Sequence, residues 1–127
     1  MTPECEALLR AADDKPKAAQ LLLDAGLDGD VASRAYYAAF HAVSALHLAS
    51  GNTFSSHAQL IGRFNKDYVR TGIFAPSLTR VLTRLFEDRQ LGDYDPTTAV
   101  SSEQARQDIM DARQIVEAIR AHLTPRI

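Results

Sequence analysis

Apolar side chains recur three and four residues apart through most of the chain, which is the spacing that gives an α-helix one buried face. No segment alternates apolar and polar residues as a half-buried strand would. The pattern predicts an all-α fold, an up-and-down bundle of four to five helices that occupies residues 1–127 as a single domain. The helices are expected over about Thr2 to Asp24, Asp28 or Asp30 to Ser50, residues 56 to 71, Pro76 to Leu91, and residues 102 to 124.

Capping residues and glycines mark the expected helix ends. Thr2 is placed to cap the first helix, Ser55 or Ser56 the third, and Ser101 or Ser102 the last. Gly26, Gly51 and Gly72 are stop signals. The run from Gly92 to Pro96 predicts a turn after the fourth helix.

The second predicted helix is unusual for the number of alanines on it. Small side chains at helical spacing allow another helix to approach its backbone closely, so we expect this helix to be packed inside the bundle. The alanines that line it are Ala35, Ala38, Ala39, Ala42, Ala45 and Ala49.

Composition narrows the possible classes of protein. Hydrophobic residues make up 46% of the chain and charged residues 24%, as in an ordinary globular domain. Cys5 is the only cysteine, which excludes an intrachain disulfide and a cysteine-based metal site within one chain. No apolar run approaches the roughly 20 residues that cross a bilayer. The first residues are acidic, unlike a secretory signal, so we expect a cytoplasmic protein without membrane contact.

Charge is distributed unevenly although the net charge is only −2. Residues 1–30 carry seven acids and three bases, whereas residues 31–60 carry one base and no acid. Residues 61–90 carry six bases and three acids. The middle of the chain is therefore electropositive and suited to a polyanion such as RNA, although a solvated helix face with arginines would look the same.

Arg34 and His41 form the strongest chemical pattern in the chain. They lie seven residues apart on a predicted helix, so both side chains leave the same face with a rise of about 10 Å between them. A guanidinium can bind phosphate oxygens in bidentate fashion, and an imidazole can move a proton near neutral pH. The pair is a candidate for RNA cleavage without a metal ion or other cofactor. The same spacing also arises by chance in many helices.

Further residues are candidates for contacting the substrate. Tyr37 shares the face of Arg34 and His41, where it could bind phosphate or stack on a base, or simply pack between helices. Ser33 could bind phosphate or be an ordinary helix residue. His57 lies in the first turn of a helix, where it could contact an anion or simply be a neutral histidine near the cap. Arg63 and Lys66 share a face of that helix and could contact phosphates.

Arg89 lies near the end of the fourth predicted helix. Asp93 or Tyr94 could hold it across the following turn. We interpret this group as a structural clasp. Histidine and cysteine residues show no ligand spacing that would indicate a zinc site.

The order of these elements resembles the HEPN superfamily, specifically the small stand-alone HEPN proteins grouped as UPF0332. The resemblance covers most of the chain. It rests on Ser33-Arg34-Ala35-Tyr36-Tyr37-Ala38-Ala39-Phe40-His41-Ala42, on Ser56-His57 with Phe64, and on Arg89 with Asp93-Tyr94.

The resemblance implies a bundle of four to five helices, commonly a homodimer. It also implies a toxin–antitoxin pair in which the antitoxin is a minimal nucleotidyltransferase. Many HEPN proteins are ribonucleases that use an arginine, four to six intervening residues and a histidine, and here Arg34 and His41 enclose six. A symmetric dimer would bring two copies of the pair to one cleft.

Two positions depart from the family pattern. The residue after the arginine is usually Asn, Asp or His, whereas this chain has Ala35. One toxin branch has a tyrosine two places after the histidine that its partner modifies, whereas this chain has Val43. Modification at that place is therefore not expected, and the absence of a polar residue beside Arg34 weakens the argument for catalysis.

Three hypotheses follow from the sequence. The chain is a HEPN ribonuclease toxin, or a non-catalytic HEPN module that binds a nucleotidyltransferase or a nucleotide, or a structural helical dimer in which Arg34 and His41 are packed. The sequence favours the first.

Overall fold

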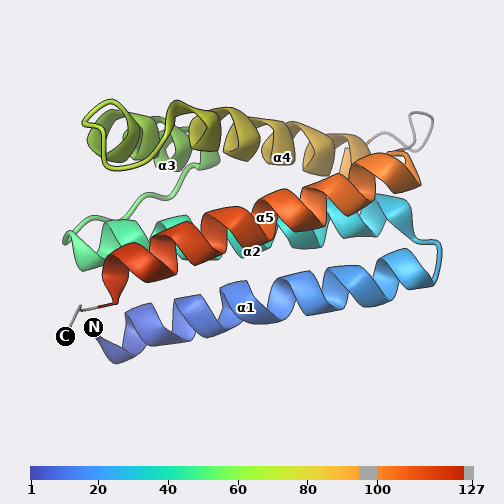
Figure 1. Cartoon of the computed structure of the whole chain (residues 1–127), viewed down its shortest axis with the longest axis horizontal. Helices are drawn as coiled ribbons and strands as arrows, with labels where there is room; N and C mark the ends of the chain where they lie inside the picture. Colours follow the sequence, from blue (N-terminus) through green and yellow to red (C-terminus); the bar gives the residue numbers. More distant parts are fainter. Residues whose placement is uncertain (95–99, 125–127) are drawn as a thin grey trace.

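The computed structural model describes residues 1–94 and 100–124, and these form an antiparallel helical bundle (Figure 1). Helix α1 spans Pro3–Asp24, α2 Asp28–Ala49, α3 His57–Phe64, α4 Pro76–Tyr94 and α5 Ser102–Leu123. A short π-helix, η1, spans Asn65–Val69 directly after α3. The described residues contain no strand. The predicted all-α bundle is therefore confirmed.

Helix α2 is the central element of the bundle. It packs against α1, α4 and α5, as Figure 1 shows. Its alanines at positions 35, 38, 39, 42 and 45 are completely buried, because their small side chains let neighbouring helices lie close to the α2 backbone. The packing role predicted for this helix is confirmed for these five alanines, whereas Ala49 at the end of α2 is exposed. Larger residues of the neighbouring helices, among them Leu9, Leu82 and Ile115, complete the core.

The helix ends agree largely with the sequence signals. The side chains of Thr2, Ser56 and Ser101 each accept a hydrogen bond from the backbone N–H three residues later, at 3.2, 3.1 and 3.0 Å. Each bond satisfies one of the N–H groups that a helix start leaves free. Gly26 and Gly51 adopt positive φ angles of 77° and 83° just beyond α1 and α2, where other residues would be strained.

Two predicted boundaries are wrong. The third helix does not continue regularly to residue 71, because the backbone changes to η1 after Phe64. Helix α4 continues through Gly92 and Asp93 to Tyr94 instead of ending at Leu91. The extension is possible because Gly92 has no side chain and lies directly on the backbone of Gly29 in α2. Asp95 and Pro96, the rest of the predicted turn, lie outside the described residues.

Candidate functional site

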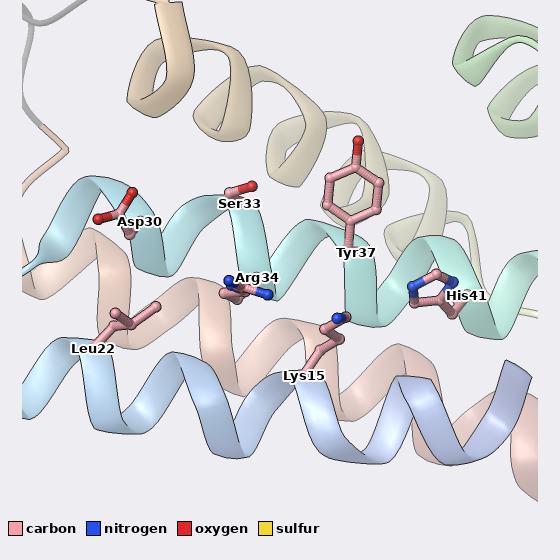
Figure 2. A pocket seen from close by; sticks show the side chains of 7 residues that line it. All are labelled: Lys15, Leu22, Asp30, Ser33, Arg34, Tyr37 and His41. Atoms are coloured by element: carbon pink, nitrogen blue, oxygen red, sulfur yellow. The ribbon is translucent and has the colours of Figure 1, made fainter.

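A pocket of about 580 Å³ lies beside the face of α2 that carries Arg34 and His41 (Figure 2). Its lining comes from two helices. The residues are Lys15 and Leu22 from α1, and Asp30, Ser33, Arg34, Tyr37 and His41 from α2. The sequence prediction that Arg34, Tyr37 and His41 share one helix face is confirmed, because intervals of three and four residues bring side chains to one side of a helix.

Arg34 is exposed at this pocket. Its guanidinium has no carboxylate or other hydrogen-bond partner within residues 1–94 and 100–124. Other arginines of the chain, such as Arg63 and Arg120, form ion pairs with aspartates. The five N–H donors of Arg34 therefore remain available to a ligand.

His41 is half-buried at the same pocket. Burial lowers the pKa of His41, and the positive charge of Lys15 lowers it further. The imidazole is therefore mainly neutral at pH 7. Its Nδ1 is covered by protein and meets no hydrogen-bond partner in the described part of the chain. Nε2 is the nitrogen left for a ligand, and it can accept a proton when the neutral ring carries its hydrogen on Nδ1.

Lys15 and Asp30 belong to the pocket but were missed by the sequence analysis. Figure 2 shows Lys15 reaching from α1 toward α2, with its ammonium between Arg34 and His41 in this view. Only the packing of α1 on α2 brings Lys15 there, and no spacing within one helix predicts it. Asp30 lies one helical turn before Arg34, so its place on the same face could have been predicted from the spacing in the sequence.

Tyr37 and Ser33 also line the pocket, in agreement with their predicted positions. The Tyr37 ring centre lies 6.1 Å from that of His41 and 5.6 Å from that of Phe40. In Figure 2 this ring extends away from α1, with its hydroxyl at the end farthest from Lys15. Tyr37 thus borders the site and packs between helices, as both sequence interpretations allowed.

The HEPN domain profile matches residues 5–122 of the chain. The chain belongs to the HEPN family. The resemblance noted in the sequence is therefore confirmed over nearly its whole length. The match spans all five α-helices except the first residues of α1 and the last residue of α5.

Two relatives and one solved structure place this HEPN chain more closely. A "UPF0332 protein" of Thermotoga maritima is 37% identical over 101 residues, which cover 80% of this chain and 76% of that one. A Methanocaldococcus jannaschii protein that bears the name "putative toxin" is 32% identical over 120 residues, or 94% of this chain and 89% of that one. The crystal structure of TT1696 from Thermus thermophilus superposes with a TM-score of 0.80 at 19% identity, covering 96% of this chain and 100% of that one, and shows the same fold.

His57 does not line the pocket of this HEPN domain. Its Nδ1 lies 2.7 Å from the hydroxyl of Tyr36, and its ring stacks on Phe86 with centres 5.4 Å apart. Burial lowers the pKa of His57, and Arg89 lowers it further. His57 is thus held within an aromatic cluster. The centre of its ring lies 6.2 Å from that of Tyr37, which does line the pocket.

Arg63 and Lys66 are also outside the pocket. Arg63 donates two hydrogen bonds to Asp67, at 3.2 and 3.0 Å, and lies over the Phe54 ring. Lys66 is exposed on η1. The structure therefore does not bring these two side chains together with Arg34 and His41.

The clasp predicted at Arg89 is confirmed for Asp93. The Arg89 Nε lies 3.0 Å from the Asp93 carboxylate, one turn further along α4 rather than across a turn. The guanidinium carbon also lies 5.3 Å from the centre of the Tyr37 ring, a cation–π distance. The side chain of Tyr94 is outside the described part of the structure. Within the described ranges, no three His, Cys, Asp or Glu side chains form a group suited to a metal ion, and no helix is long and apolar enough to cross a membrane.

Proposed function

We propose that this HEPN protein is an endoribonuclease that needs no metal ion, with Arg34 and His41 as its catalytic residues. The observation that carries the proposal is the meeting of an arginine without an ion-pair partner and a neutral histidine at one pocket. Cleavage of an RNA phosphodiester uses both groups. The cation binds phosphate oxygens, and the imidazole takes the proton of the neighbouring 2′-hydroxyl.

The reaction follows from these roles. Nε2 of His41 removes the proton from the 2′-hydroxyl, and the 2′-oxygen forms a bond to phosphorus. The bond from phosphorus to the 5′-oxygen breaks, which leaves a 2′,3′-cyclic phosphate on one fragment and a 5′-hydroxyl on the other. Arg34 stabilises the negative charge that builds on the phosphate oxygens in the transition state.

The leaving 5′-oxygen also needs a proton. One histidine does not readily accept and donate a proton in the same step, so we assign the donation to His41 of a second copy in its protonated form. A two-fold axis beside the pocket would bring two copies of Arg34 and His41 to one substrate. The protein would then act as a homodimer.

We further propose that the chain is the toxin of a toxin–antitoxin pair in the cytoplasm, and that a minimal nucleotidyltransferase is its antitoxin. Relatives that bear the name "putative toxin", at 32% and 28% identity, support the toxin role. The family resemblance supports the nucleotidyltransferase partner. Val43 is completely buried in α2, so the place that carries a modified tyrosine in one toxin branch is inaccessible here as well as chemically different.

One observation favours a second function. Ala35 follows Arg34 and is completely buried against the bundle, so the position that is usually polar in HEPN ribonucleases contributes nothing to this pocket. A non-catalytic module that binds a minimal nucleotidyltransferase or a nucleotide would tolerate this change. In that case the pocket would bind a phosphate without cleaving RNA.

The decisive experiment is cleavage of RNA by the purified protein in the presence of EDTA. We compare wild type with His41→Ala and Arg34→Ala. The matched controls are His122→Ala and Arg70→Ala, since both residues are exposed outside the pocket. The proposal expects cyclic-phosphate products from wild type and both controls, and their loss in both pocket variants.

Other outcomes separate the alternatives. Absence of cleavage by a folded protein that still binds a co-expressed nucleotidyltransferase, with and without His41→Ala, would support the non-catalytic module. Cleavage that survives both pocket substitutions would mean that a contaminating nuclease or another site is responsible, and would end the assignment of Arg34 and His41.

A further inference from the structure

Lys15 is the one lysine among the residues that line the Arg34–His41 pocket. It comes from α1, whereas Arg34 and His41 come from α2. Its side chain is half-buried, and its ammonium lies on the α2 side of α1 in Figure 2. Lys15 therefore adds a second cation to the lining of the pocket that Arg34 and His41 share.

The acidic neighbours of Lys15 are engaged elsewhere. Asp13 pairs with Arg120 of α5, and Asp14 lies 3.8 Å from Lys17 on the exposed side of α1. Lys15 itself has no ion pair or hydrogen bond to any residue within 1–94 and 100–124. Partial burial of an uncompensated cation costs free energy, and an anionic ligand would offset that cost.

The charges at the pocket favour an anion. Lys15 and Arg34 contribute two positive charges, and Asp30 is the single acid among the lining residues. The two cations differ in geometry, because arginine offers a planar fork of donors and lysine a compact charge with three donors. A tetrahedral phosphate between the two helices can use both, with one oxygen pair on Arg34 and another oxygen on Lys15.

We propose that Lys15 is a second phosphate-binding residue of this site, so that an RNA phosphodiester is held between α1 and α2 rather than on α2 alone. The inference rests on the proposed function for the nature of the ligand. Lys15 also has an effect in the free protein, since its charge contributes to the low pKa of His41 and so keeps more of the imidazole in the form that accepts a proton. The charged and titratable groups around His41 at the pocket are Lys15, Arg34, Asp30 and Tyr37.

The test uses the full chain and an RNA oligonucleotide with 2′-O-methyl groups. This RNA lacks the 2′-hydroxyl nucleophile, so it is not cleaved during the binding measurement. Binding is measured by fluorescence anisotropy at several salt concentrations for wild type, Lys15→Gln, Lys15→Arg and Lys17→Gln. Lys17 is the matched control because it is on the same helix and is exposed with a side-chain accessibility of 73%. We expect Lys15→Gln to weaken binding about tenfold and to lower the salt dependence by about one released counterion. Lys15→Arg and Lys17→Gln should bind nearly as wild type does.

A second measurement does not depend on any ligand. The pKa of His41, followed by NMR in the free protein, should rise toward its ordinary value in Lys15→Gln and stay unchanged in Lys17→Gln. Equal binding by wild type and Lys15→Gln would overturn the proposal, because Lys15 would then not contact the RNA. An equal loss in Lys17→Gln would also overturn it, because the charge would then act only diffusely.

These outcomes separate the inference from the proposed function. Lys15-dependent binding of the methylated RNA without cleavage of ordinary RNA would retain the phosphate site and reject the ribonuclease. If cleavage depends on Arg34 and His41, but Lys15→Gln cleaves and binds RNA as well as wild type does, the ribonuclease is retained and the role of Lys15 is rejected.

Discussion

The contact between Gly92 of α4 and Gly29 of α2 gives a sharp prediction about stability. The two backbones meet directly, and a Cβ placed on Gly92 would overlap the carbonyl oxygen of Gly29 and lie 3.2 Å from its carbonyl carbon. A Cβ on Gly29 would lie 3.7 Å from the carbonyl oxygen of Gly92, which is an ordinary contact. The same interface therefore tolerates a methyl group on one side and not on the other.

The expected magnitudes follow from two opposing effects. Replacing glycine by alanine inside a helix gains about 1 kcal/mol from propensity. Forcing a methyl group against backbone atoms costs about 2–3 kcal/mol here, the upper part of the usual range for overpacking, because a carbonyl cannot rotate away as a flexible side chain can. Gly92→Ala should therefore lower the free energy of unfolding by about 1–2 kcal/mol. Gly29→Ala should change it little, because Gly29 lies in the first turn of α2, where alanine gains less than in a helix interior. Gly62→Ala should raise it, because no atom lies within 4 Å of a Cβ at position 62.

Urea unfolding followed by circular dichroism measures these differences. The order of stability should be Gly62→Ala, then wild type and Gly29→Ala, then Gly92→Ala. Arg89 lies one turn before Gly92 and packs on the Tyr37 ring of the pocket, so Gly92→Ala should also weaken binding of the methylated RNA. If Gly29→Ala costs as much as Gly92→Ala, or if Gly92→Ala is as stable as wild type, the two helices do not meet as described.

Three further predictions concern buried polar groups and the charge of the pocket. Burial and the nearby Asp88 raise the pKa of Asp108 to about 7, so between about pH 4 and 7 the folded state holds a proton that the unfolded state has lost. The free energy of unfolding should therefore fall as the pH rises through that range and level off above it. Asp108→Asn should flatten this pH dependence in urea unfolding, whereas an unchanged pH dependence would contradict the assignment. Tyr36→Phe removes the hydrogen bond to His57 and should cost about 1 kcal/mol, together with a changed NMR titration of His57 that a purely steric effect would not produce. Asp30→Asn should strengthen binding of the methylated RNA several-fold at low salt and much less at high salt. If the variant and wild type bind equally well at both salt concentrations, Asp30 lies away from the bound phosphates.

Local patterns in the sequence predicted most of the fold. Helical spacing of apolar residues located all five α-helices, and the caps at Thr2, Ser56 and Ser101 are hydrogen-bonded as expected. The common face of Arg34 and His41 was also predictable, because residues on one helix keep a fixed angular relation. These are relations over a few residues, which the helix geometry alone determines.

Relations between helices were not predictable in this way. Lys15 joins the pocket because of how α1 lies on α2, and no spacing within α1 expresses that register. His57 was a candidate for contacting an anion or for a neutral histidine near a helix cap, and the packing of α3 on α2 and α4 sets its ring against Tyr36 and Phe86. Gly92 was interpreted as a turn residue because the sequence does not show that another glycine backbone lies against it.

The position of Ala35 links the packing of α2 to the composition of its pocket. Successive residues of a helix point about 100° apart, so the residue after Arg34 turns from the pocket to the core, where Ala35 is completely buried. A polar group at that position would have to be buried without water and would need its own partner in the core. In this chain α1 contributes a cation, Lys15, to the lining of the pocket. If Lys15 binds phosphate as proposed, the function of the pocket depends on the α1–α2 contact, and substitutions that shift α1 along α2 should affect RNA binding even when Arg34 and His41 are intact.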